Sequence, residues 1–175
     1  MTRRSFARLA LTLPAAAALV AATTAAAPDA GAAARFGPPW ISIEYPPSPY
    51  DRTTRDAYLL VHAFHHGTPS DFPVAGTAEG LVNGERRTVK LEFTSTSRTG
   101  VYALRKQWPT EGRWALVVRV LQGTEDAATA LVRIGGDGQV AQVTVPTRDQ
   151  NGYRVPRSVT AAEVDAALRS AVASR

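Results

Sequence analysis

Leu81-Val82-Asn83-Gly84-Glu85-Arg86 is the clearest local signal of structure in this chain. Asn-Gly is the preferred pair for a two-residue type I′ hairpin turn, because both central positions need a positive φ. With residues 83–84 as the turn, Val82 faces Glu85, and the register of the remaining pairs follows. On one face the predicted pairs join small residues to bulky ones: Ala78 with Val89, Gly76 with Leu91 and Val74 with Phe93. The other face is polar (Thr77, Glu79, Arg86, Thr88, Lys90, Glu92), which indicates an antiparallel sheet with one buried and one solvated face.

Two further hairpins are predicted on either side of glycine-containing loops. Residues 100–108 and 113–121 flank Pro109-Thr110-Glu111-Gly112, a loop typical of type I turns. In that register the core face carries Val101, Ala103, Trp114, Leu116, Val118 and Val120. Residues 130–134 and 139–145 flank Gly135-Gly136-Asp137-Gly138. With the runs at 40–45 and 58–66, about eight strands result, and their spacing predicts an all-β, immunoglobulin-like antiparallel β-sandwich.

The C-terminal segment has a helical pattern. Thr160-Ala161-Ala162-Glu163 is a capping box, and Val164, Leu168 and Val172 then recur at four-residue spacing. A helix this short is marginal alone, so we expect it to pack on the sandwich. The predicted organisation is a linker at 35–39, a sandwich domain at 40–147, a loop at 148–158 and a helix at 159–175.

The first 34 residues are predicted to be an export signal. Thr2-Arg3-Arg4-Ser5-Phe6 resembles the twin-arginine pattern, and an alanine-rich run with small-residue cleavage sites follows. Ala7 and Arg8 depart from that pattern, so general secretory export stays open, as does an uncleaved amphipathic helix. Pro14 and Thr23-Thr24 interrupt the apolar run, so no permanent membrane span is expected after cleavage. The predicted location is periplasmic or secreted.

Composition narrows the function classes. The 175 residues contain no cysteine, which excludes disulfides, zinc–thiolate sites and a thiol nucleophile. Without residues 1–34 the chain holds 17 basic and 14 acidic residues, a net charge of +3. The basic residues are scattered among acids, so no nucleic-acid partner is predicted. Hydrolase-elbow, phosphate-loop, zinc-protease and dinucleotide motifs are missing from the sequence, and we predict neither a cofactor nor an enzyme.

Two groups of residues are candidate sites. In the register proposed for 100–121, Trp108 faces Arg113 and Tyr102 faces Arg119. These four side chains would form an aromatic–basic surface that suits a protein or glycan partner, unless the C-terminal helix or a loop covers it. The second group is His62-Ala63-Phe64-His65-His66. Along a strand His62 and His66 lie roughly 13 Å apart, so only His65 and His66 are candidate metal ligands, and only if the strand ends or bulges there. Otherwise the histidines are ordinary strand and turn residues.

Gly100-Val101-Tyr102-Ala103-Leu104 together with Trp108-Pro109-Thr110-Glu111-Gly112-Arg113-Trp114 resembles the paired Gly-x-Tyr and Gly-x-Trp strands of exported bacterial immunoglobulin-like modules, YtkA-like and FixH-like domains among them. The resemblance covers residues 57–121. It implies a non-enzymatic accessory role in the envelope, in some members near copper or cytochrome assembly. Met1 is the only methionine and no second hydrophobic span follows, so a methionine-rich copper site is absent.

The sequence thus predicts a non-catalytic exported binding or accessory module of the bacterial envelope. The alternative is a periplasmic copper- or zinc-handling protein that uses His62, His65 and His66.

Overall fold

The computed structural model describes residues 37–124 and 126–170, and over these ranges the chain is an antiparallel β-sandwich with one C-terminal helix. The predicted all-β fold is therefore confirmed, although the described residues form twelve strands where about eight were expected. The export signal predicted at residues 1–34 lies outside the described residues. Within the described residues no helix is long and apolar enough to cross a membrane.

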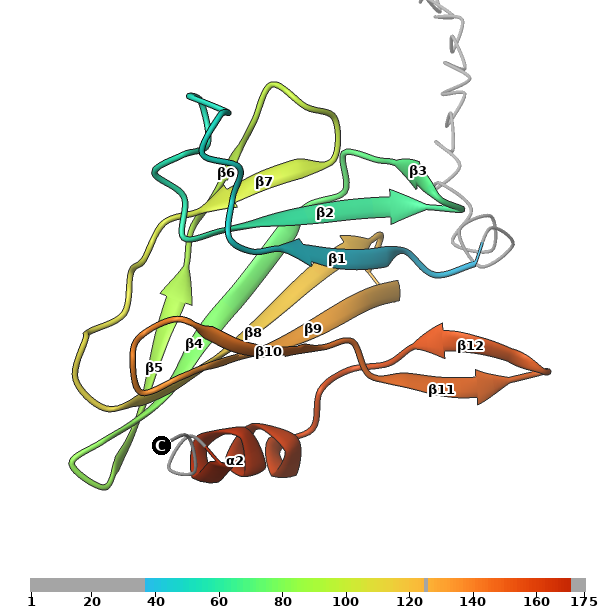
Figure 1. Cartoon of the computed structure of the whole chain (residues 1–175). Helices are drawn as coiled ribbons and strands as arrows, with labels where there is room; N and C mark the ends of the chain where they lie inside the picture. Colours follow the sequence, from blue (N-terminus) through green and yellow to red (C-terminus); the bar gives the residue numbers. More distant parts are fainter. Residues whose placement is uncertain (1–36, 125, 171–175) are drawn as a thin grey trace, which may run out of the picture.

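Two five-stranded sheets form the layers of the sandwich, with the core between them (Figure 1). The first sheet has the order β1-β2-β7-β6, and β3 also pairs with β2. Its strands are β1 (Trp40–Glu44), β2 (Leu59–His65), β3 (Thr68–Pro69), β6 (Phe93–Ser95) and β7 (Val101–Leu104). The second sheet has the order β10-β9-β8-β4-β5. Its strands are β4 (Val74–Val82), β5 (Glu85–Leu91), β8 (Arg113–Gln122), β9 (Asp126–Ile134) and β10 (Val140–Thr144).

The Asn83-Gly84 hairpin joins β4 and β5 in the predicted register. Val82 pairs with Glu85, Ala78 with Val89 and Gly76 with Leu91, and the φ angles of Asn83 and Gly84 are 51° and 85°. The small residues of β4 make room for bulky neighbours in the core. A Cβ on Gly80 would lie 2.5 Å from the ring of Trp114, which is 3% exposed on β8.

The predicted pairing of Val74 with Phe93 is wrong, because the chain changes sheets at Glu92. β5 ends at Leu91 in the second sheet, whereas Phe93 begins β6 and pairs with Leu104 in the first. The side-chain amide of Gln107 replaces the missing strand neighbour at this crossing. It donates to the Glu92 carbonyl at 2.7 Å and accepts from the Glu92 N–H at 2.9 Å, which satisfies both backbone groups.

The predicted hairpin of residues 100–121 is also wrong. β7 pairs with β2 and β6 in one sheet, and β8 pairs with β4 and β9 in the other. β7 ends at Leu104, and residues 105–112 carry the chain from one sheet to the other. Trp108, on this crossing, buries its ring in the core, where its centroid lies 5.0 Å from that of Tyr58 in an edge-on contact. The predicted core face of β8 is nevertheless confirmed, since Trp114, Leu116, Val118 and Val120 are all buried between the sheets.

The hairpin across residues 135–138 is confirmed. β9 and β10 pair there, with Val140 opposite Ile134 and a register shift before Gln142. Tyr58 closes this end of the sandwich by donating its hydroxyl to the carbonyl of Gly138 at 2.8 Å. Burial, together with the nearby Tyr45 and Asp137, raises the pKa of Tyr58 above its usual value, so this hydroxyl keeps its proton and acts as a donor.

Residues 148–158 are predicted to form a loop, but they contribute to a third sheet, which has two strands and is separate from the other two. β11 (Thr147–Gln150) pairs with β12 (Tyr153–Pro156) around Asn151-Gly152, whose φ angles of 51° and 80° repeat those of the Asn83-Gly84 turn. We call this hairpin the arm. Figure 1 shows it extending away from the sandwich at the end where β1 begins.

The C-terminal helix, α2 (Ala161–Ser170), covers the outer face of the second sheet. Val164, Ala167 and Leu168 are buried there, which confirms the predicted docking as far as Ser170; Val172 lies outside the described residues. The capping box is confirmed as well. The Thr160 N–H donates to a Glu163 carboxylate oxygen at 2.8 Å, and the Glu163 N–H donates to the Thr160 hydroxyl at 3.3 Å.

Candidate functional site

The arm forms one wall of a cleft against the sandwich. In its register Arg148 lies opposite Val155 and Gln150 opposite Tyr153, so these four side chains share one face of the two-stranded sheet. All four residues line hollows whose other walls come from the sandwich. We call this space the arm cleft. Residues 37 and 38, which precede β1, line both of its parts.

The first part of the arm cleft is cationic. It has a volume of about 410 Å³ and is lined by the side chains of Arg119 from β8, Arg148 from the arm and Arg157 beyond it. Asp126 is the one acid among the described residues that line it. Arg157 is paired with Glu163, whereas Arg119 and Arg148 have no ion-pair partner among the described residues; Arg148 donates to Gln150 at 3.0 Å. Counted over the described residues, this part of the cleft therefore has a net positive charge.

The second part of the arm cleft is aromatic. It has a volume of about 570 Å³ and is lined by Trp40 from β1, Tyr153 from the arm and His66 from the turn between β2 and β3. Arg154 of the arm is the one charged side chain among its described lining residues, apart from the titratable His66. Tyr153 is 74% exposed and Trp40 is 40% exposed. Trp, Tyr and Arg are the residue types that contribute most to binding energy in protein interfaces, and here they line one exposed hollow.

A bidentate ion pair secures the base of the arm. Arg157 follows β12 directly and donates to both carboxylate oxygens of Glu163 on α2, at 2.7 and 2.9 Å. Hydrogen bonds from Arg157 and Thr160 hold the pKa of Glu163 at about 2, well below its usual value, so the pair stays charged. The Glu163 carboxylate thus caps α2 and also orients Arg157, which lines the cleft. Because α2 packs on the second sheet, this contact ties the base of the arm to that sheet.

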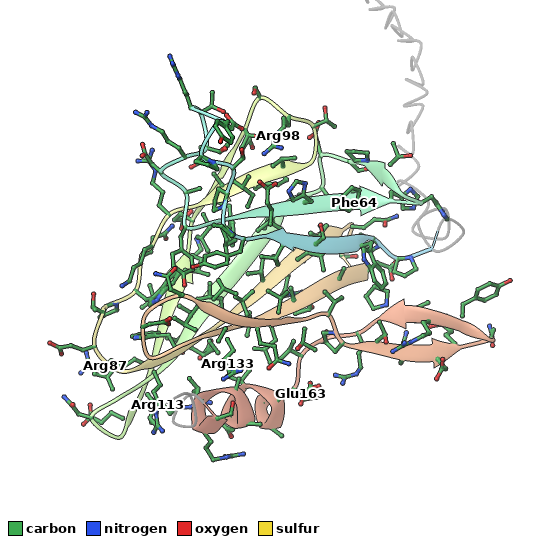
Figure 2. The ribbon with its side chains drawn as sticks, in the orientation of Figure 1. Phe64, Arg87, Arg98, Arg113, Arg133 and Glu163 are labelled. Carbon is green, nitrogen blue, oxygen red and sulfur yellow. The ribbon has the colours of Figure 1, made fainter. Side chains whose placement is uncertain are left out.

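The predicted aromatic–basic surface does not form. Trp108 is buried in the core, and Tyr102 pairs with Val61 and Ser95 in the first sheet. Arg113 and Arg119 lie in the second sheet, and Figure 2 shows Arg113 near α2. The prediction failed because it assumed that residues 100–121 form one hairpin. Of the four residues, Arg119 alone lines the arm cleft.

The structure brings two of the three histidines together. β2 ends at His65, and His66 and Gly67 have φ angles of 49° and 78°, so the chain turns there as the metal hypothesis required. The ring centroids of His65 and His66 lie 4.3 Å apart, and that of Phe72 lies 5.9 Å from His65. His62 is separate from this pair. It lies partly buried in β2, and its Nε2 is 2.9 Å from a carboxylate oxygen of Glu44. Within residues 37–124 and 126–170, no group of three or more His, Asp or Glu side chains is placed to hold a metal ion.

Sequence reasoning missed most of the arm cleft. The predicted loop at 148–158 has no partner across it, so the sequence does not indicate Arg148, Tyr153 or Arg157 as site residues, and no motif marks Trp40. One signal was available. Asn151-Gly152 repeats the dipeptide that identified the first hairpin, and Tyr153 and Val155 after it alternate with Arg154 as in a strand.

Comparison of the chain with protein-family models, with curated proteins and with solved structures found no match.

Proposed function

We propose that this chain is an exported, non-catalytic binding module of the bacterial envelope and that it binds its ligand in the arm cleft. The observation that carries the proposal is the 74% exposure of Tyr153 on the cleft-facing side of the arm, with Trp40 lining the same hollow. A bound ligand would remove this apolar surface from water, at roughly 25 cal/mol per Å² buried.

The way the arm is held supports the same proposal. A two-stranded sheet is marginally stable by itself, and this one extends away from the sandwich (Figure 1). The ion pair between Arg157 and Glu163 anchors one end of it. An anchored, protruding hairpin with polar and aromatic side chains on its inner face is suited to hold a ligand against a rigid support.

The export part of the proposal rests on residues 1–34. N-terminal sequencing of the protein recovered from fractionated cells should find a chain that begins near Ala33 or Arg35, outside the cytoplasm. The resemblance of residues 57–121 to exported immunoglobulin-like modules is the ground for proposing an accessory role. A cytoplasmic protein that retains Met1 would contradict the export proposal.

Binding is tested by co-sedimentation of the purified protein with insoluble envelope material from the cells that produce it. We expect the protein to sediment and the Tyr153→Ala variant to lose most of this binding. Tyr50→Ala is the matched control, because Tyr50 is 93% exposed and lies in the loop between β1 and β2. Equal sedimentation of both variants would show that the arm cleft is not the binding site, and no sedimentation of the parent protein would contradict envelope binding.

Metal handling is the second candidate function, and the 4.3 Å separation of the His65 and His66 rings favours it. Two imidazoles can hold Cu(II) or Zn(II) when other ligands complete the coordination. Titration of the chelator-treated protein with each metal tests this. A stoichiometric submicromolar site that His65→Ala and His66→Ala abolish, and His62→Ala does not, would support metal handling. Binding that survives both substitutions would contradict it.

A further inference from the structure

We propose that the ligand of the arm cleft is an acidic polysaccharide chain, with a uronic-acid carboxylate on the arginine side and a sugar ring on the aromatic side. This inference rests on the proposed binding function and adds the chemical class of the ligand. It is drawn from three features of the cleft: arginines with no ion-pair partner among the described residues, exposed aromatic rings, and two hollows that share lining residues.

The arginines select a carboxylate. Arg119 and Arg148 line the cationic hollow with no ion-pair partner among the described residues, and Asp126 is the one acid that lines it. A guanidinium is planar and presents paired N–H donors, so it matches a carboxylate in a bidentate arrangement. The donation from Arg148 to Gln150 uses one terminal nitrogen, which leaves further N–H donors for a ligand.

The aromatic rings select a sugar. Trp40 and Tyr153 line a hollow together with the amide side chains of Gln150 and Asn151. A pyranose ring has an apolar C–H face that packs flat on an aromatic ring, and its hydroxyls need donors and acceptors at the edge. Side-chain amides supply both a carbonyl acceptor and N–H donors. An acidic peptide would satisfy the arginines but has no flat ring to place here unless it is itself aromatic.

The shape of the cleft selects a chain over a single small molecule. The hollows measure about 410 and 570 Å³, each within the range of roughly 300–1,000 Å³ found for small-molecule sites. Five residues line both: Gly37, Pro38, Gln150, Val155 and Pro156. A ligand that occupies both hollows therefore contacts these shared residues, as two or more linked sugars would.

The test is isothermal titration of the purified protein with tetrasaccharides of galacturonate, mannuronate and glucuronate. We expect at least one to bind, and its fully methyl-esterified form, which keeps the sugar rings and loses the charge, to bind about tenfold more weakly or not at all. Arg148→Gln and Tyr153→Ala should each weaken binding about tenfold or more. Both side chains are exposed, so these variants should fold, which circular dichroism checks.

Matched controls are available on the same protein. Arg87→Gln removes an exposed arginine from β5, which lies far from the arm in Figure 2, and Tyr50→Ala removes an exposed tyrosine from the loop after β1. Neither control should change the affinity. A polyglutamate peptide and a single-stranded oligonucleotide complete the panel. Tighter binding of either than of every oligouronate would overturn the proposal in favour of an acidic protein or a nucleic acid.

Other outcomes separate this inference from the proposed function. If no oligouronate binds, or if the methyl esters bind equally well, the acidic-sugar inference is wrong. If envelope binding then still depends on Tyr153, the binding function stands with a different ligand. If envelope binding is independent of Tyr153 as well, both proposals fail.

Discussion

Replacing Glu163 tests how the arm and the helix are held together. Its carboxylate accepts two hydrogen bonds from Arg157 and two from Thr160, through the backbone N–H and the hydroxyl. Glu163→Ala removes all of these, whereas Glu163→Gln keeps an oxygen acceptor for Thr160 and loses the charge that pairs with Arg157. The two substitutions therefore separate the helix cap from the ion pair.

The expected magnitudes follow from the exposure of these groups. The side chain of Glu163 is 34% exposed, so solvent screens the pair, and loss of its charge in Glu163→Gln should lower the free energy of unfolding by about 1 kcal/mol. Loss of the reach-back to the helix N-terminus adds about 1 kcal/mol, so Glu163→Ala should cost about 2 kcal/mol. Urea unfolding at pH 7 measures both values.

The dependence on pH has a definite sign. Because the pKa of Glu163 is lowered to about 2 in the folded protein, its contribution is fully present above the unfolded value of about 4.3. It is lost as the pH falls from about 4.3 to about 2. The stability difference between the parent protein and Glu163→Gln should shrink over this window and vanish near its lower end. Indistinguishable stabilities at pH 7, or a difference that persists unchanged at pH 2, would refute the role assigned to the pair.

Two further predictions concern the core. Gly80→Ala should lower the free energy of unfolding by about 1–3 kcal/mol, because the new Cβ would lie 2.5 Å from the ring of the buried Trp114. Gly136→Ala is the control and should be nearly neutral, because a Cβ there meets no atom within 4 Å. Equal unfolding midpoints for the two variants would contradict the close approach of Gly80 to the ring. Phe93→Ala should lower the free energy of unfolding by about 2–4 kcal/mol, somewhat less than the roughly 3–5 kcal/mol typical of a fully buried phenylalanine, because Phe93 is only partly buried. Glu92→Ala should cost under about 0.5 kcal/mol, because the Glu92 side chain is exposed. Comparable losses for the two variants in urea unfolding would show that Phe93 does not belong to the core.

Local structure could be predicted from the sequence pattern alone. Asn83-Gly84 specified a hairpin and its register, because a type I′ turn restricts both central residues and one-residue slippage would expose the buried face. Thr160 and Glu163 specified the start of α2, because each side chain satisfies the backbone N–H of the other residue. Alternating apolar residues identified the buried face of β8. Each of these features depends on residues only a few positions apart, so it can be recognised from the pattern of the sequence.

Which sheet each strand joins depends on long-range packing, which the sequence pattern does not show. The change of sheet at Glu92 and the burial of Trp108 depend on Gln107 and Tyr58, which lie 15 and 50 residues away along the chain. The sequence pattern of residues 100–121 is equally compatible with one hairpin or with two strands in facing sheets, since both bury the same face of β8. The arm cleft has the same origin. Trp40, Arg119 and Tyr153 belong to β1, β8 and β12, and no periodicity along the chain relates them. The position of the arm relative to the sandwich places them around one cleft.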